Sequence, residues 1–229
     1  KSKLTRSAPV CATSSAGIRD SQAVGTMHQI FFQDIDQFKH LSPSELTVSV
    51  VGFGYVGTCI GALLASKGVR VFGIDTNHKV VEEINRGATS IEEPHLEEYV
   101  EQAHGSKKLQ ASTQYDSISA TDVVLVTVGT PLDEDHAADL EPMRSACESI
   151  GKNLQAGTVV IVKSTVPPLS TQGWLKDVLE ENSGLAAGKD FGLVFSPERL
   201  SEGNAIQELQ RIPVVVGGVD AKSTDIAAA

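Results

Sequence analysis

Residues 47–75, TVSVVGFGYVGTCIGALLASKGVRVFGID, contain the pattern that decides the fold. An apolar run over residues 47–51 leads into three glycines spaced as G-x-G-x-x-G, and a helical pattern follows until a further glycine ends it. A second apolar run over residues 69–74 ends at Asp75. This order of strand, glycine turn, helix, strand and carboxylate is the dinucleotide-binding fingerprint in its required context. We therefore predict a parallel βαβ unit that holds a dinucleotide.

Each residue of the fingerprint has a physical role. Gly52 makes the tight turn, Gly54 lets the backbone approach the pyrophosphate, and Gly57 lets the helix pack closely on the strand. The pyrophosphate then lies at the helix N-terminus, where backbone N–H groups lack intrahelical partners. Asp75 is placed to accept hydrogen bonds from the adenosine ribose, and its charge repels a 2′-phosphate. We therefore expect NAD rather than NADP as the cofactor.

The alternative interpretation of this stretch is a membrane helix. Residues 46–66 carry no charged side chain, and Gly57-x-x-x-Gly61 matches a helix-packing motif. However, four glycines lie in this stretch and the β-branched residues precede them, which favours a strand followed by a turn. We therefore expect no membrane segment and no membrane partner.

The composition limits the class of the protein and its partners. The sequence has 229 residues, a hydrophobic fraction of 41% and a net charge of −10, values typical of an ordinary globular protein. The negative charge disfavours nucleic acid as a partner, since nucleic acid binds clustered Lys and Arg. The three cysteines form no CxxC pair and the six histidines show no ligand-like spacing. We therefore expect a reducing, cytoplasmic compartment and no metal site.

The N-terminal part differs from the rest of the chain. Residues 1–19 contain four basic and no acidic side chains, as in a disordered tail or an organelle transit peptide. An arbitrary extension is the alternative, because the chain does not begin with Met. Residues 30–38 are expected to form a short helix over the domain. The expected organisation is an N-terminal extension over 1–40, a dinucleotide-binding domain over 41–220 and the start of a linker over 221–229.

Apolar runs alternate with helical patterns along the rest of the chain. One helix is expected to end at Gly87, one to follow Pro94, one to begin near Pro142 and one to be capped by Ser170. The expected strands after Asp75 are residues 109–112, 123–128, 158–162, 191–195 and 212–216. This alternation predicts an α/β fold with a doubly wound, mostly parallel Rossmann-type sheet and helices on both faces.

An acidic segment surrounds Pro94. Its carboxylates are Glu92, Glu93, Glu97, Glu98 and Glu101. Paired carboxylates can serve a metal or acid–base chemistry, but at this density they are more often a solvated helix face. We interpret them as such a face.

In doubly wound sheets, ligands bind at the carboxyl ends of the strands. The loops that follow the apolar runs are therefore expected to meet at one edge, and they are residues 52–57, 129–131, 164–168 and 196–203. Glu198 and Glu202 are spaced to point the same way on a helical turn, and one could act as a general base. The alternative for each is a surface carboxylate. Thr130 and Thr165 stand beside prolines, where a hydroxyl can instead satisfy local backbone groups.

The motifs taken together resemble a known family. Gly-Phe-Gly-Tyr-Val-Gly from Gly52, Val-Gly-Thr-Pro from Val128, Lys-Ser-Thr-Val-Pro-Pro from Lys163 and Ser-Pro-Glu-Arg-x-x-x-Gly from Ser196 occur in this order. The set is similar to the UDP-glucose/GDP-mannose dehydrogenase family, and over about residues 47–220 it resembles that family's N-terminal NAD-binding domain. The resemblance implies an NAD-dependent four-electron oxidation of the C6 hydroxyl of a nucleotide sugar to a carboxylate, through an aldehyde and a cysteine thioester.

The resemblance also implies roles for individual residues. The cofactor would be held by Gly52, Gly54, Tyr55, Val56, Gly57, Asp75, Gly129, Thr130, Pro131, Ser164, Thr165 and Glu202. Thr165 would help to position a water, and Glu198 would be the acid/base for thioester hydrolysis. Glu198, Arg199 and Leu200 would contact the substrate, a UDP-sugar. Arg199 after Pro-Glu favours the branch that acts on UDP-N-acetylmannosamine over the UDP-glucose type. The protein would be a homodimer or a higher oligomer.

Some features depart from the family pattern. Pro94-His95 replaces the usual Pro-Gly, and Val80 stands where a basic residue is often found. The family's cysteine nucleophile follows the segment matched here, and neither Cys59 nor Cys147 matches it. We therefore expect this chain alone to bind NAD weakly and not to complete turnover.

Two alternatives stay open. One is another Rossmann dehydrogenase, of the 3-hydroxyacid or 6-phosphogluconate type, but such enzymes lack the loops at 163–168 and 196–203. The other is a non-catalytic NAD-binding or regulatory module, which the position of the family's cysteine outside the matched segment allows.

Overall fold

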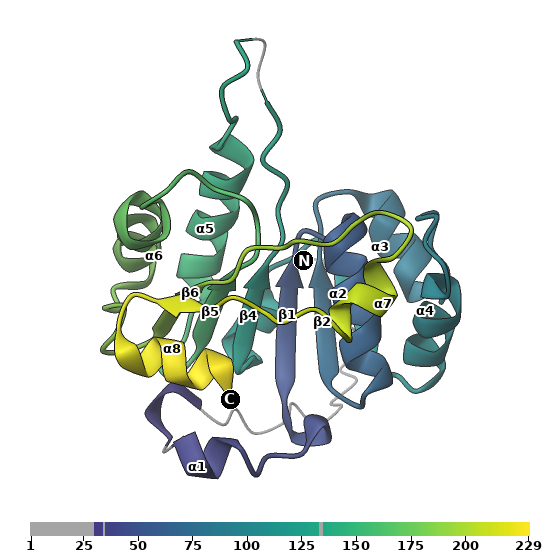
Figure 1. Cartoon of the computed structure of the whole chain (residues 1–229), viewed down its shortest axis with the longest axis horizontal. Helices are drawn as coiled ribbons and strands as arrows, with labels where there is room; N and C mark the ends of the chain where they lie inside the picture. Colours follow the sequence, from purple (N-terminus) through teal and green to yellow (C-terminus); the bar gives the residue numbers. More distant parts are fainter. Residues whose placement is uncertain (1–29, 34, 133–134) are drawn as a thin grey trace, which may run out of the picture.

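Figure 1 shows a computed structural model of the protein, which describes residues 30–33, 35–132 and 135–229. In this part of the chain a seven-stranded sheet has the order β3-β2-β1-β4-β5-β6-β7. The strands are β1 (Thr47–Val51), β2 (Arg70–Ile74), β3 (Leu109–Ser112), β4 (Val123–Val126), β5 (Val159–Val162), β6 (Gly192–Phe195) and β7 (Gly217–Gly218). Strands β1 to β6 are parallel, and β7 is antiparallel to β6. The predicted doubly wound, mostly parallel sheet is confirmed.

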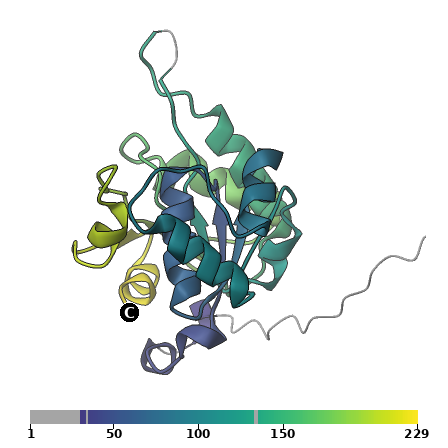
Figure 2. The same cartoon turned by 90° about the vertical axis from the view of Figure 1, so that its right-hand side faces the viewer.

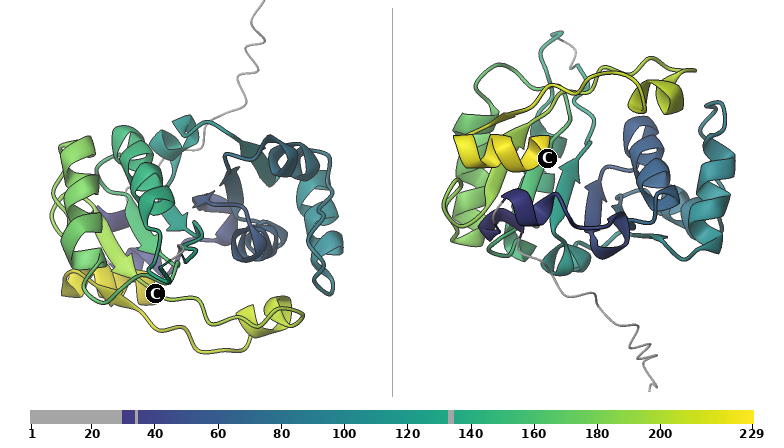
Figure 3. Two further views of the ribbon diagram at one scale, coloured as in Figure 1. Left: turned by 90° about the horizontal axis from the view of Figure 1, so that it is seen from above. Right: turned by 60° about the horizontal axis from the view of Figure 1, so that its bottom comes forward.

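Helices cover both faces of the sheet (Figures 2 and 3). They are α1 (Ile35–Phe38), α2 (Tyr55–Ser66), α3 (His78–Asn85), α4 (Leu96–Gly105), α5 (Glu141–Asn153), α6 (Lys176–Ser183), α7 (Ala205–Leu209) and α8 (Ala221–Ala228). Short turns of 3-10 helix occur at Ile30–Phe32, Pro43–Glu45 and Asp116–Ala120, and a π-helical turn at Thr171–Leu175. Helices α5 and α6 lie behind the sheet in the view of Figure 1, and α7 and α8 lie in front of it.

The strands alternate their side chains between two cores, because successive residues of a strand point to opposite faces. In β4, Val124 and Val126 belong to the core beneath α5 and α6. Leu125 belongs to the core beneath α2 and α4. Strands that are buried on both faces read as continuous apolar runs, and this is why the sequence pattern located them correctly.

The segment before β1 is part of the fold. Ile30 and Phe31 are buried against Val159, Val194 and Ile226. The N–H of Phe31 donates to the carbonyl of Gly157 at 2.8 Å. Where one short helix was expected over residues 30–38, the structure has two short helical segments, the 3-10 turn Ile30–Phe32 and α1. The expectations for residues 1–19 concern residues outside the described part.

Other expectations differ from the structure in detail. The strands at 123–128, 158–162 and 191–195 are each one or two residues shorter than expected. The helix expected after Ser170 begins as a π-helical turn, and the Ser170 side chain makes no capping hydrogen bond. Gly173 interrupts it with φ −103° and ψ −117°.

The prediction of a strand over residues 212–216 is wrong. Pairing with β6 is limited to Gly217 and Gly218. Pro213 has no N–H to donate to a sheet, and Val214 and Val215 are 64% and 54% exposed. The apolar run therefore crosses the front of the molecule from α7 to β7 as an extended segment (Figure 1). At residue 221, where the start of a linker was expected, helix α8 begins, and Ile226 of this helix is buried on the sheet.

We predict that Phe31→Ala lowers the free energy of unfolding by about 3–5 kcal/mol, because it removes a fully buried aromatic ring. Phe32→Ala is the matched control. Its ring is 48% exposed, so the loss should be about 1 kcal/mol or less. Urea unfolding, followed by the fluorescence of the single tryptophan, measures both values. Equal losses would mean that residues 30–33 do not form part of the core.

Candidate active site

The four loops that were predicted to meet lie at the carboxyl edge of the sheet. Thr127 Oγ1 donates to the carbonyl of Gly52 at 2.7 Å, so the loop after β4 holds the glycine turn. Thr130 Oγ1 donates to the carbonyl of Thr165 at 2.8 Å, which joins the loops after β4 and β5. Hydrogen bonds between backbone and side chains thus connect segments that are 35 and 75 positions apart. The predicted convergence is confirmed.

The three glycines of the turn are required for different reasons. Gly52 has φ +90°, a conformation that side chains rarely adopt. A Cβ on Gly57 would lie 2.1 Å from the carbonyl oxygen of Gly52, so only glycine lets α2 approach β1 this closely. A Cβ on Gly54 would meet no heavy atom within 4 Å. The fold therefore does not need a glycine at position 54. A phosphate group that binds the adjoining N–H groups does need one, because the backbone must approach it closely.

A cleft of about 360 Å³ lies beside the turn. Four predicted cofactor residues line it, namely Gly52, Gly54, Asp75 and Gly129. The other predicted cofactor residues lie outside its walls, and they are Tyr55, Val56, Gly57, Thr130, Pro131, Ser164, Thr165 and Glu202. Tyr55, Val56 and Gly57 form the first turn of α2, and the side chain of Glu202 is exposed. The glycine turn, the cleft and the acid at its rim fit a dinucleotide.

Asp75 is held at this rim by backbone groups. Its Oδ2 accepts a hydrogen bond from the N–H of Phe53 at 2.7 Å, and its Oδ1 accepts one from the N–H of Asn77 at 2.8 Å. The carboxylate therefore has a fixed orientation before any ribose arrives. Tyr115, which the sequence analysis missed, lines the cleft as well. Burial, with a smaller contribution from Asp75, raises the pKa of Tyr115, so its hydroxyl keeps its proton at neutral pH.

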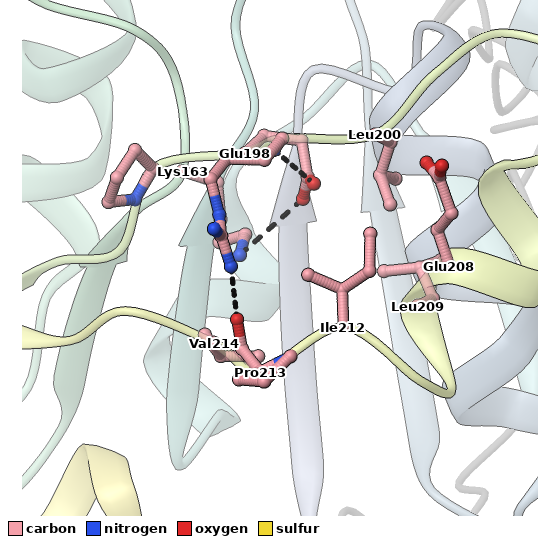
Figure 4. Close-up of a pocket in the computed structure, with 10 residues that line it drawn as sticks. Lys163, Glu198, Leu200, Glu208, Leu209, Ile212, Pro213 and Val214 are labelled. Atoms are coloured by element: carbon pink, nitrogen blue, oxygen red, sulfur yellow. Dashed lines mark hydrogen bonds and ion pairs between the residues drawn. The ribbon is translucent and has the colours of Figure 1, made fainter.

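The candidate acid/base Glu198 is paired with a lysine. Lys163 Nζ lies 3.5 Å from Glu198 Oε2, and the two side chains are 12% and 16% exposed. The backbone reinforces this pair, since the N–H of Glu198 donates to the carbonyl of Lys163 at 3.0 Å. Figure 4 shows the two side chains facing one another. Lys163 was missed as a site residue, although its place at the end of β5 is a signal that could have found it.

Arg199 and Leu200 border the same site. The loop after β6, residues 196–203, is named here the acid–base loop. The Arg199 guanidinium donates to the carbonyl of Pro213 and so joins this acid–base loop to the extended segment before β7. Leu200, Leu209 and Ile212 enclose a pocket of about 40 Å³ next to Glu198 (Figure 4). Thr165 is exposed at the carboxyl edge. The structure thus brings Glu198, Arg199 and Leu200 together, and their roles stay predictions.

The acidic segment near Pro94 behaves as predicted with one exception. Glu92, Glu97, Glu98 and Glu101 are exposed. Glu93 is buried, and its carboxylate accepts hydrogen bonds from other segments. The interpretation of Glu93 as part of a solvated face is therefore wrong, because contacts distant in sequence enclose it.

The described cysteines are Cys59 and Cys147, and both are free and buried. Burial raises the pKa of each thiol to about 12. Neither thiol is therefore prepared to act as a thiolate nucleophile. The described residues contain no group of His, Cys, Asp and Glu that could hold a metal ion. None of the described helices is long and apolar enough to cross a membrane.

Comparison with known proteins places this site in a family. Residues 46–229 match the NAD binding domain of the UDP-glucose/GDP-mannose dehydrogenase family. The chain belongs to this family. It is 35% identical over 186 residues to GDP-mannose 6-dehydrogenase of Pseudomonas putida, covering 79% of this chain and 42% of the relative. It is 37% identical over 191 residues to UDP-N-acetyl-D-mannosamine dehydrogenase of Yersinia pestis, covering 80% and 44%.

Solved structures of family members have the same fold. A ternary complex of GDP-mannose dehydrogenase from Pseudomonas aeruginosa superposes with a TM-score of 0.76 at 31% identity, covering 79% of this chain and 42% of that chain. The UDP-N-acetylmannosamine dehydrogenase of Pyrococcus horikoshii gives 0.76 at 30% identity, covering 80% and 43%. The present chain therefore spans less than half the length of these relatives.

We predict that Gly54→Ala keeps the fold but weakens NAD binding. The methyl group meets no protein atom but obstructs N–H groups whose hydrogen bonds to a charged ligand are worth about 1.5–3 kcal/mol, or tenfold or more in Kd. Gly57→Ala should instead lower the free energy of unfolding by about 1–3 kcal/mol through overpacking. Calorimetric titration with NAD and urea unfolding separate the two effects. If the Gly54→Ala variant bound NAD with unchanged affinity, the pyrophosphate would have to bind somewhere other than at this turn.

We also predict that Asp75→Asn raises the Kd for NAD by about tenfold and narrows the preference for NAD over NADP, because it removes the charge at the ribose. Asp177→Asn, at an exposed position of α6, is the control and should change neither affinity. The measurement is titration of each variant with NAD and with NADP. Equal NADP affinities in the wild type and the Asp75→Asn variant would contradict the assignment of Asp75.

Proposed function

We propose that this chain is the cofactor-binding domain of a nucleotide-sugar 6-dehydrogenase, which oxidises a UDP-sugar of the N-acetylmannosamine or glucose type to the uronic acid. The observation that carries the proposal is the Lys163–Glu198 pair at the same edge of the sheet as the glycine turn. The names of the relatives support it, since they are GDP-mannose, UDP-N-acetylmannosamine and UDP-glucose dehydrogenases.

NAD, when bound, supplies the acceptor for the hydride that leaves the sugar. The N–H groups at the start of α2 would hold its pyrophosphate, and Asp75 would accept hydrogen bonds from the adenosine ribose. Gly129 would border its other end, as the resemblance implies. The loops after β5 and β6 follow the neighbouring parallel strands and so lie at the same edge of the sheet as this cleft.

Glu198 is the proposed acid/base of this domain. Its Oε2 is buried beside the ammonium of Lys163 and accepts no hydrogen bond from the described residues, so it retains the capacity to take a proton from a water or hydroxyl that the substrate brings to it. The ammonium of Lys163 holds this carboxylate in place from one side. Arg199 and Leu200 follow on the same loop and would contact the sugar nucleotide. Thr165 would help to position the water.

The proposal extends to the compartment and the assembly of the protein. We propose a cytoplasmic location, which the two free, buried thiols support because such thiols persist in reducing compartments. We also propose a homodimer or a higher oligomer, which the family resemblance supports. The exposed apolar side chains Leu169 and Val214 are further support. Light scattering of the protein in solution measures the oligomeric state.

The test uses the whole product of the gene that encodes this chain and a panel of UDP-hexoses and GDP-mannose, with NADH formation as the readout. We expect two NADH per sugar oxidised, since four electrons leave each sugar. Glu198→Gln should lower turnover by about 10²–10⁴-fold, the usual contribution of a general acid or base, with little change in the Kd for NAD. Glu181→Gln, exposed on α6, is the control. NAD binding without NADH formation from any sugar would favour a non-catalytic module.

A further inference from the structure

Glu93 lies on the loop between α3 and α4, is 8% exposed and joins three segments of the chain. Its Oε2 accepts hydrogen bonds from the hydroxyl of Tyr55 and from the N–H of Gly203, the latter at 2.8 Å. Its Oε1 accepts a hydrogen bond from the N–H of Ile206 at 3.2 Å. A single carboxylate therefore binds the first turn of α2 on one side and the segment 203–206 on the other.

The Tyr55 side of this contact belongs to the cofactor-binding turn. Tyr55 is the first residue of α2 and directly follows Gly54. Its hydroxyl also accepts a hydrogen bond from the N–H of Gly203 at 3.0 Å. Burial and the hydrogen bond to Glu93 raise the pKa of Tyr55 to about 12, so the hydroxyl donates to Glu93 throughout the neutral range. The turn that would hold the pyrophosphate is thus fixed to Glu93 by a side chain of its own helix.

The other side of the contact belongs to the acid–base loop. The loop is anchored at its start, where the N–H of Glu198 donates to the carbonyl of Lys163 at 3.0 Å. It is anchored again at its end by the bonds of Gly203 and Ile206 to Glu93. Beyond this point α7 packs on α2, with Ile206 in their shared core. The two anchors bracket the four exposed or half-buried residues 199–202. Among these, the resemblance assigns Arg199 and Leu200 to the substrate and Glu202 to the cofactor.

We propose that Glu93 is a positioning residue that couples the cofactor-binding turn to the acid–base loop. Binding of the pyrophosphate fixes the first turn of α2, and because Tyr55 in that turn holds Glu93, the segment 203–206 loses motion as well. If NAD binding stabilises this contact by a given factor, then by thermodynamic reciprocity the intact contact must strengthen NAD binding by that same factor. The coupling itself requires only NAD binding, and its meaning for catalysis rests on the proposed function.

The test is amide hydrogen exchange of this chain, with and without saturating NAD, together with the Kd for NAD. In the wild type, NAD should slow exchange at Gly203 and Ile206 by about fivefold or more, the lower range of coupling between sites. Glu93→Gln leaves one acceptor oxygen and turns an amide N–H₂ toward other donors. Tyr55→Phe removes only the hydroxyl. In both variants NAD should no longer slow the exchange of these amides. The Kd for NAD should rise by the same factor by which NAD slows this exchange in the wild type.

Glu92→Gln is the matched control, because Glu92 is the exposed neighbour of Glu93 and the chemical change is the same. It should leave both the NAD effect and the Kd unchanged. The inference is overturned if NAD does not slow exchange at Gly203 and Ile206 in the wild type, or if Tyr55→Phe keeps the full effect. A purely structural contact would lower stability in the variants without making these amides respond to NAD. Absence of sugar oxidation would refute the proposed function and leave this result intact.

Discussion

The backbone contact between Gly57 and Gly52 sets the distance between α2 and β1, and the site depends on this distance. A side chain at either position would collide with main-chain atoms, so the helix starts directly above the end of the strand. Its unpaired N–H groups are then presented at the carboxyl edge of the sheet, where an anionic ligand is favoured. Thr127 fixes the same turn from the neighbouring strand through the carbonyl of Gly52. These contacts set the position of the glycine turn relative to β1 and β4.

Two buried or nearly buried carboxylates fasten the acid–base loop over this frame, each in a different way. Glu198 is held by a cation, Lys163, and by a backbone hydrogen bond to the carbonyl of the same residue, directly after β5. Glu93 instead accepts hydrogen bonds from a phenol and two backbone N–H groups. Burial of a carboxylate is costly unless such partners are present. Their presence at both ends of one loop explains how a segment with little regular structure keeps a defined position.

Sequence reasoning recovered most of the fold because the relevant signals are local. The glycine turn, the acid at Asp75 and the apolar runs each depend on neighbouring residues. Parallel strands buried on both faces leave little ambiguity in such runs. The prediction from sequence failed at residues 212–216, where an apolar run with a proline resembles a strand. Whether such a run pairs depends on a free sheet edge and on the path of the chain, which local pattern does not contain.

The sequence by itself therefore determined the βαβ unit, the order of the loops and the chemical type of the cofactor site, since these follow from the period and spacing of adjacent residues. Only the tertiary structure decided the partners of the carboxylates. Gly203 and Glu93 are 110 positions apart, and Gly203 and Tyr55 are 148 apart. Glu93 has the same local surroundings as its exposed acidic neighbours, and its burial arises because α7 and the loop before it fold back onto α2.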